Sequence, residues 1–355
     1  MDELRIDSHK LIYHVPRVDD WLRGRDVYPI YIEVSPIGAC NHRCTFCALD
    51  YMEYRPDALD AAVLKERLAE MGRLGVKSIM YAGEGEPLLH REIADIVAHT
   101  KRSGIDAAVT SNGVCLTEKT ARAVLPHLTW IKISINAGTP GTYAAVHGTG
   151  AGDFHRVMEN TAGAVRIRRE LGLGVTIGMQ MILLPENASE AAALAAAAKE
   201  AGADYLVVKA YSQHRMSRTE RYRDLRYSDF MHLQDELAAF RDERFNVVFR
   251  AGSMRKLERG RRYYEKCQAL PFWSYVDSRG GLWGCSAYLG DERFLYGNIY
   301  DTTFEEAWKG ERRKEVLRLV AEDLDTDHCR INCRMDEVNR YLWELRHPPA
   351  HVNFI

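Results

Sequence analysis

Short β-rich apolar runs alternate with amphipathic stretches over the first two thirds of the chain. Apolar spacing between the runs indicates helices. The first helix has Ala61, Leu64, Leu68 and Met71 on one face, with Asp57 as its expected N-cap and Gly75 just past its end. The predicted strands are residues 31–36, 77–82, 106–111, 130–136, 174–183 and 204–208, and the later helices are 91–103, 116–125, 153–171 and 188–201.

Strands that are separated by helices of this length predict a parallel sheet of the α/β class. Six such units with right-handed crossovers favour a partial (β/α)6, TIM-like barrel, although periodicity alone does not separate a barrel from a flat sheet. The regular alternation of strand and helix ends at about residue 245. Beyond it, residues 272–277 and 281–285 indicate a hairpin, and residues 303–309 and 336–346 indicate helices. We therefore expect a lead segment (1–29), a barrel (30–245) and a small α+β domain (246–355).

Composition narrows the function classes. Of the 355 residues, 46% are hydrophobic and 28% are charged, with a net charge of -2. This charge balance gives no electrostatic basis for a nucleic-acid partner. No apolar run reaches membrane-spanning length, and the polar start lacks the apolar core of a secretory signal, so we expect a cytoplasmic protein with no membrane partner. Eight cysteines in a reducing compartment point to metal binding more than to disulfides.

Three cysteines follow the first predicted strand directly, in the sequence Cys40-Asn-His-Arg-Cys44-Thr-Phe-Cys47. Three thiolates within eight residues can wrap one face of a compact iron–sulfur cluster and leave one iron open. Free thiols and a structural zinc site are the alternatives. Zinc prefers four closed ligands, and His42, the available fourth, sits inside the tight loop where it is poorly placed to complete a tetrahedron.

The spacing Cys-x3-Cys-x2-Cys after a first strand resembles the signature of the radical S-adenosylmethionine (SAM) superfamily. The resemblance implies a [4Fe–4S] cluster whose open iron chelates SAM. Reductive cleavage of SAM then yields a 5′-deoxyadenosyl radical that abstracts hydrogen from a substrate. Such a cluster must be reduced on every turnover, so we expect flavodoxin or ferredoxin as the electron donor.

Motifs after the next strands match the same family in order, over about residues 30–210. Each motif alone is also typical of a turn. The resemblance implies that these residues bind SAM: Phe46 beside adenine; Gly83, Glu84, Gly85, Glu86 and Pro87, where Glu84 replaces a family glycine; Ser111 and Asn112 before Gly113; and Ser134 and Asn136, where Asn136 replaces a family aspartate.

The remaining clustered cysteines are Cys267, Cys285, Cys329 and Cys333. Four thiolates can close a site completely, and a four-cysteine zinc site is the alternative. The pattern Cys-x12-Gly-x4-Cys, followed later by Cys-x3-Cys, resembles the twitch domain, a shortened SPASM extension. The resemblance implies a single auxiliary [4Fe–4S] cluster that relays electrons.

Several side chains are candidates for the substrate site. Gln180, Lys209, Tyr211 and His214 lie at or after the ends of the last two predicted strands. Lys209 follows an apolar run, so it is either a buried base or charge anchor, or a lysine that reaches the surface. His214 is either catalytic or a satisfied loop residue. Cys115 is either a packed hydrophobe or a thiol that donates hydrogen to a substrate radical.

Two basic stretches, residues 215–226 and 255–266, carry arginines interleaved with tyrosines. They suit a nucleotide sugar, or else they are solvated helix faces. Relatives of the twitch type act on sugars, aminocyclitols and nucleotide sugars, which favours oxidation of a hydroxyl-bearing carbon, with electron transfer to the auxiliary cluster. The alternatives are a radical epimerase, a carbon–carbon bond-forming enzyme of natural-product biosynthesis, and a peptide-modifying enzyme.

Overall fold

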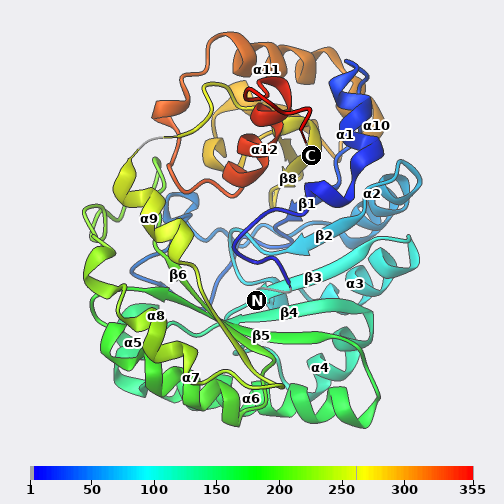
Figure 1. The fold of residues 1–355 in the computed structure, drawn as a ribbon. Coiled ribbons are helices and arrows are strands. Elements are labelled where there is room, and N and C mark those ends of the chain that lie inside the picture. Colours follow the sequence, from blue (N-terminus) through cyan, green and yellow to red (C-terminus); the bar gives the residue numbers. More distant parts are fainter. Residues whose placement is uncertain (1–3, 261, 355) are drawn as a thin grey trace.

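A computed structural model describes residues 4–260 and 262–354, and its strands form one twisted ten-stranded sheet. Its order is β10-β9-β8-β1-β2-β3-β4-β5-β6-β7, with every pair from β8 through β1 to β7 parallel (Figure 1). The predicted α/β class with a parallel, barrel-like sheet is confirmed. The six predicted strands are β1 (Tyr31–Val34), β2 (Ser78–Tyr81), β3 (Asp106–Ser111), β4 (Leu128–Ser134), β5 (Thr176–Leu183) and β6 (Tyr205–Ala210).

Residues beyond the predicted boundary extend the same sheet at both of its ends. Strand β7 (Asn246–Phe249) pairs with β6, and β8 (Trp273–Val276) pairs with β1. The predicted hairpin is present, because β9 (Gly281–Trp283) runs antiparallel to β8, and β10 (Leu295–Asn298) then pairs with β9. The division into a barrel and a C-terminal unit stays a prediction, and both parts share one sheet.

The predicted helices are also present. The first one starts later than expected: Asp60, not Asp57, is its N-cap, because the Asp60 carboxylate accepts hydrogen bonds from the N–H groups of Ala62 (2.8 Å) and Val63 (3.0 Å). These helices are α2 (Ala61–Arg73), α3 (Ile93–Arg102), α4 (Glu118–Val124), α6 (Gly152–Glu170), α7 (Ala191–Glu200), α10 (Phe304–Lys309) and α12 (Asp336–Arg346).

Five further α-helices were not predicted from the sequence pattern. They are α1 (Val15–Leu22), α5 (Pro140–His147), α8 (Leu233–Ala238), α9 (Ala251–Arg259) and α11 (Glu311–Glu322). In Figure 1, α11 and α12 lie above the β8–β1 part of the sheet, whereas α4, α6 and α7 lie beside β4 and β5. No helix among the described residues has the length and apolar character needed to cross a membrane.

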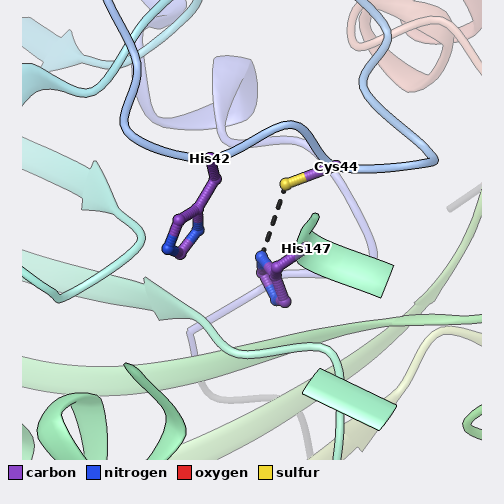
Figure 2. A group of neighbouring side chains, drawn as sticks. All are labelled: His42, Cys44 and His147. Atoms are coloured by element: carbon purple, nitrogen blue, oxygen red, sulfur yellow. Dashed lines mark hydrogen bonds between the residues drawn. The ribbon is translucent and has the colours of Figure 1, made fainter. Parts of the chain in front are cut away.

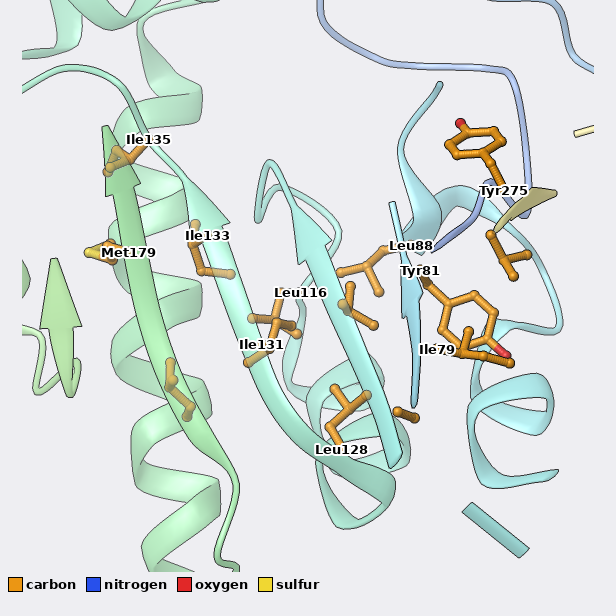
Figure 3. Packing of buried hydrophobic residues seen from close by; sticks show 14 of the residues in the cluster. Ile79, Tyr81, Leu88, Leu116, Leu128, Ile131, Ile133, Ile135, Met179 and Tyr275 are labelled. Carbon is orange, nitrogen blue, oxygen red and sulfur yellow. The ribbon is translucent and has the colours of Figure 1, made fainter. Parts of the chain in front are cut away.

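The main core lies between the sheet and its outer helices (Figure 3). On β4, Ile131 and Ile133 are fully buried in this core, whereas Lys132 between them is half-buried. Because successive strand residues point to opposite faces, Lys132 and Ser134 face the concave inner side of the sheet. That inner side carries smaller apolar clusters, such as Met80 with Ala108 against Trp130, and is therefore free to hold polar groups.

Candidate active site

The three-cysteine loop follows β1, and Cys40, Cys44 and Cys47 are half-buried and free of disulfides. The C-terminal end of α5 fixes the loop backbone: the N–H of Arg43 donates to the carbonyl of His147, and the N–H of Thr45 donates to that of Val146, both at 2.9 Å. Burial, followed by the charges of the other cysteines, raises the pKa of Cys44. The three thiols therefore share one electrostatic environment, as ligands of one centre would.

The loop after β2 supports the cysteine loop from below. Gly85 has a φ of +72°, and a Cβ there would overlap the carbonyl oxygens of Ile37 and Ala39. The N–H of Glu86 donates to that Ala39 carbonyl at 2.8 Å. Only glycine permits this approach of two backbones. The Gly83–Pro87 motif thus positions the chain that leads into Cys40.

Glu86 joins the loops after β2 and β3. One carboxylate oxygen accepts hydrogen bonds from the Ser111 hydroxyl (2.7 Å) and the Leu88 N–H (3.0 Å), and the other accepts from the Asn112 N–H (2.7 Å). The Asn112 side-chain amide in turn donates to the side-chain oxygen (Oδ1) of Asn41 at 2.7 Å. Burial raises the pKa of Glu86, and these hydrogen bonds oppose that shift. The expected ammonium acceptor is thus also the structural link between three loops.

Two predicted SAM ligands are held by neighbouring backbone groups. Asn136 is fully buried at a φ of +49°, and its side-chain oxygen accepts a hydrogen bond from the Ile182 N–H at 2.6 Å. The amide thereby links the end of β4 to β5, and the expected ribose contact stays a prediction. Glu84 accepts a hydrogen bond from the Ser278 N–H at 2.7 Å, so its carboxylate holds the β8–β9 turn. Ser134 keeps its inward position, 3.4 Å from the Gln180 amide nitrogen.

His42, Cys44 and His147 form a compact group whose ligand atoms lie within 4.8 Å of one another (Figure 2). His147 contacts the Ile135 carbonyl through Nε2 at 2.8 Å and Cys44 Sγ through Nδ1 at 3.4 Å. Phe46 is buried and meets the His147 ring edge-on at 5.6 Å. Among the described residues, no other group of three ligand-type side chains is this tight.

The donor set bears on the choice between zinc and a cluster. Structural zinc takes four closed ligands. The loop offers three thiols, and His42 points to His147 and to Asp153, whose Oδ2 lies 3.4 Å from its Nε2. The donor set therefore fits a larger, polynuclear centre held by three thiolates.

The segment after β6 wraps around the cysteine loop. Asp50 accepts hydrogen bonds from the N–H groups of Arg218 (2.8 Å) and Thr219 (2.9 Å). The hydroxyl of Ser217 donates to Asp50 at 3.0 Å and lies 3.2 Å from the Cys47 carbonyl. Sequence reasoning missed Asp50, although its position three residues after Cys47 would have placed it beside the site.

The four C-terminal cysteines lie close enough together to affect one another's pKa. The pKa of Cys267 is raised to about 12, chiefly by burial and in smaller part by the charges of Cys333 and Cys329. Two nitrogen donors face these sulfurs at 3.4 Å, the Asn339 amide toward Cys267 and the Met335 N–H toward Cys333. Hydrogen bonds to sulfur are typical around iron–sulfur clusters, so this set also fits such a group.

Tyr211 and His214 are occupied by protein partners. The Tyr211 hydroxyl donates to Gln213 at 2.9 Å. His214 accepts a hydrogen bond from the Met216 N–H at 3.1 Å on Nδ1, and its Nε2 lies 3.2 Å from the Ser286 carbonyl. Burial and the charge of Arg330 lower the pKa of His214 to about 4. Both ring nitrogens are in use, so His214 joins the β6 segment to the loop after Cys285 and is not placed for acid–base chemistry.

Cys115 is half-buried against the main core, and burial followed by the charge of Glu86 raises its pKa. Its contact with the core favours the packing interpretation over hydrogen donation. In the first predicted arginine stretch, Arg218 pairs with Glu53 and Arg223 pairs with Glu220 at the surface. Arg261, in the second stretch, lies outside the described residues.

Lys132 and Arg330 are polar residues of the inner side that sequence reasoning did not select. Lys132 alternates with Ile131 and Ile133, a period-2 signal that marks it as inward-facing. Arg330 lies between Cys329 and Cys333 and donates two hydrogen bonds to Ser212 at 3.3 Å. Lys209 on β6 also faces inward, since it alternates with the buried residues Val208 and Ala210.

This chain combines a parallel, barrel-like sheet with a loop of three thiols at the C-terminal edge of β1. These features are typical of α/β domains that bind an iron–sulfur cluster. Residues 34–198 match the family model of the radical SAM superfamily. The chain therefore contains a radical SAM domain.

Two relatives and one solved structure indicate the range of similar proteins. GTP 3′,8-cyclase of Yersinia pestis is 31% identical over 36% of this chain and 40% of that protein. The dTDP-4-amino-4,6-dideoxy-D-glucose ammonia-lyase of Streptomyces venezuelae is 29% identical over 48% of this chain and 36% of that protein. The chain thus spans well under half of either relative. SuiB of Streptococcus suis bound to SAM is similar in fold, with a TM-score of 0.67, 16% identity, and coverage of 86% of this chain and 72% of SuiB.

Proposed function

We propose that this protein is an enzyme that cleaves SAM reductively, with a [4Fe–4S] cluster held by Cys40, Cys44 and Cys47. When bound, that cluster supplies the electron that splits SAM into methionine and a 5′-deoxyadenosyl radical. The observation that carries the proposal is the half-buried triad of free thiols at the edge of a parallel sheet, within the residues that match the family model.

The chain's own residues support this role by holding the loop open on one side. Glu86 and Asn112 fix it through the loops after β2 and β3, and α5 and Asp50 fix its other flanks. Ser134 and Gln180 face the concave side, where they are available to a bound ligand. A loop restrained on every side except the interior keeps its geometry when the fourth coordination position exchanges.

We further propose an auxiliary [4Fe–4S] cluster on Cys267, Cys285, Cys329 and Cys333. Burial and the neighbouring cysteines raise the pKa of Cys285, which supports a common site. Electron relay is the favoured role, because four thiolates leave no iron open. The eight free thiols also support a cytoplasmic location, where flavodoxin or ferredoxin supplies electrons.

For the reaction we propose hydrogen abstraction from a sugar, aminocyclitol or nucleotide sugar, followed by oxidation of the hydroxyl-bearing carbon. The sugar ammonia-lyase among the relatives supports a carbohydrate-type substrate. Epimerisation is the second candidate, and Cys115 would have to donate hydrogen for it. The packing of Cys115 against the core argues against that role.

The test uses anaerobically reconstituted protein with SAM and a chemical reductant. The wild type and Cys115→Ala should both release 5′-deoxyadenosine, whereas the variant with Cys40, Cys44 and Cys47 replaced by alanine should release none. Release by the triple variant would overturn the assignment. Deuterium incorporation from solvent without a two-electron-oxidised product would select epimerisation over oxidation.

A further inference from the structure

Two lysines project into the concave side of the sheet from neighbouring parts of the barrel. Lys132 lies on β4 between fully buried Ile131 and Ile133, with its ammonium 5.2 Å from the Trp130 ring centroid. Lys209 lies near the end of β6 between the buried residues Val208 and Ala210. Both side chains are half-buried, and their apolar neighbours on the strand pack outward.

Arginines add further positive charge to this interior, and carboxylates balance only some of it. Arg334 pairs with Glu33 at 2.9 Å, and Arg250 pairs with Asp7 at 2.9 Å. Over residues 4–260 and 262–354, no ion pair joins a carboxylate to any of three other inner cations. These are Lys132, Lys209 and Arg330.

Lys209 is close enough to both Lys132 and Arg330 to be repelled by them. Burial lowers the pKa of Lys209 strongly, and the charges of Lys132, Arg250, Arg334 and Arg330 lower it further. A cation that is withdrawn from water without an anionic partner destabilises the fold. A bound anion would remove both the repulsion and part of the desolvation cost.

The position of these charges relates them to the two cysteine sets. Arg330 lies between Cys329 and Cys333 and contacts Ser212, two residues after β6. The same segment continues to Ser217 and Thr219, which hydrogen-bond to Asp50 beside the first cysteine loop. An anion held by the three cations therefore lies in the interior that the two cysteine sets flank.

We infer that Lys132, Lys209 and Arg330 bind the phosphate group of a phosphorylated substrate and hold its remainder toward the three-cysteine loop. The inference rests on the proposed function and names its substrate class. Three cations on separate elements suit a phosphate, which carries nearly two negative charges on three terminal oxygens, better than a carboxylate with one charge. A sugar phosphate carries this charge on one phosphate, whereas a nucleoside-diphosphate sugar carries about the same total charge spread over two phosphates.

Isothermal titration of the reconstituted, SAM-loaded protein with inorganic phosphate and with pyrophosphate tests the inference. We expect binding that weakens at least tenfold in Lys209→Met and in Arg330→Met. Lys119→Met, which removes an exposed lysine on the outer helix α4, should bind as the wild type does. Tighter binding of pyrophosphate would identify a diphosphate, and tighter binding of phosphate a monoester; both support the site.

A second readout separates ligand binding from a structural role. Without added anion, Lys209→Met should be at least as stable as the wild type, since the substitution removes an unpaired inner charge. Marked destabilisation by that variant, absence of binding to the wild type, or equally tight binding of acetate would each overturn the inference. So would loss of SAM binding in Lys209→Met, because the cations would then serve the SAM carboxylate. Normal 5′-deoxyadenosine release without anion binding would overturn this inference and leave the proposed function intact. Failure of the proposed function is seen separately, as 5′-deoxyadenosine release by the triple cysteine variant.

Discussion

The side-chain amide of Asn112 donates a hydrogen bond to the side-chain oxygen of Asn41 at 2.7 Å. This contact joins the loop after β3 to the three-cysteine loop after β1, and Glu86 holds the backbone of the same Asn112. The geometry of the cysteine loop therefore depends on residues from three successive strand ends.

Glu86→Gln should destabilise the protein by about 1–3 kcal/mol. The glutamine amide would place its own N–H donors opposite the N–H and O–H donors that now bind the Glu86 carboxylate, and one of these buried donors would lose its acceptor. Urea unfolding measures the change. Glu118→Gln is the control, since Glu118 pairs with Arg122 on the exposed face of α4 and should change stability by less than about 0.5 kcal/mol. A Glu86→Gln effect as small as that of the control would show that Glu86 does not hold these loops together.

Lys132→Met should show a pH-dependent gain in stability. Burial and the charges of Arg334 and Arg250 lower the pKa of Lys132 from 10.5 to about 8, and Glu33 opposes the shift. Between those two values the unfolded chain binds more protons, so the stability of the wild type rises with pH across this window. The variant should therefore be more stable by about 1–3 kcal/mol below pH 8 and lose that advantage toward pH 10.

Denaturant unfolding at pH 7.5 and pH 9.5 checks this behaviour, with Lys119→Met as the comparison. The charged groups that act on Lys132 from neighbouring elements, namely Glu33, Arg250, Lys209 and Arg334, remain in every variant. A constant difference between wild type and Lys132→Met at both pH values would show that the ammonium is not buried among cations.

Asp50→Ala should loosen the segment that covers the cysteine loop. The variant loses acceptors for the N–H groups of Arg218 and Thr219. We expect amide hydrogen exchange at residues 217–219 to rise by about tenfold or more, which corresponds to about 1.4 kcal/mol or more of local opening free energy. Asp224→Ala, in the same exposed segment, should leave that exchange unchanged. Unaltered exchange in Asp50→Ala would show that Asp50 does not hold residues 217–219 against the cysteine loop.

Removal of Cys329 and Cys333 together should lower the iron content of the reconstituted protein from about eight to about four atoms per chain, the count for one remaining [4Fe–4S] cluster. Iron and acid-labile sulfide analysis measures this. Retention of all iron, or stoichiometric zinc in the wild type, would contradict the auxiliary cluster.

The sequence alone determined the parallel strands, because their apolar runs can be buried only inside a sheet covered by helices. It also located the three-cysteine loop, because ligand spacing within one loop is a local property, whereas the C-terminal cysteines were grouped by their resemblance to a known pattern. Tertiary structure decided which polar side chains face the interior. Asn136 and His214 matched motif or strand-end positions, yet neighbouring backbone groups capture their side chains. Lys132 and Arg330 act on Lys209 only because the fold brings β4, β6 and the C-terminal cysteine segment near one another, and such long-range proximity leaves no spacing signal along the chain.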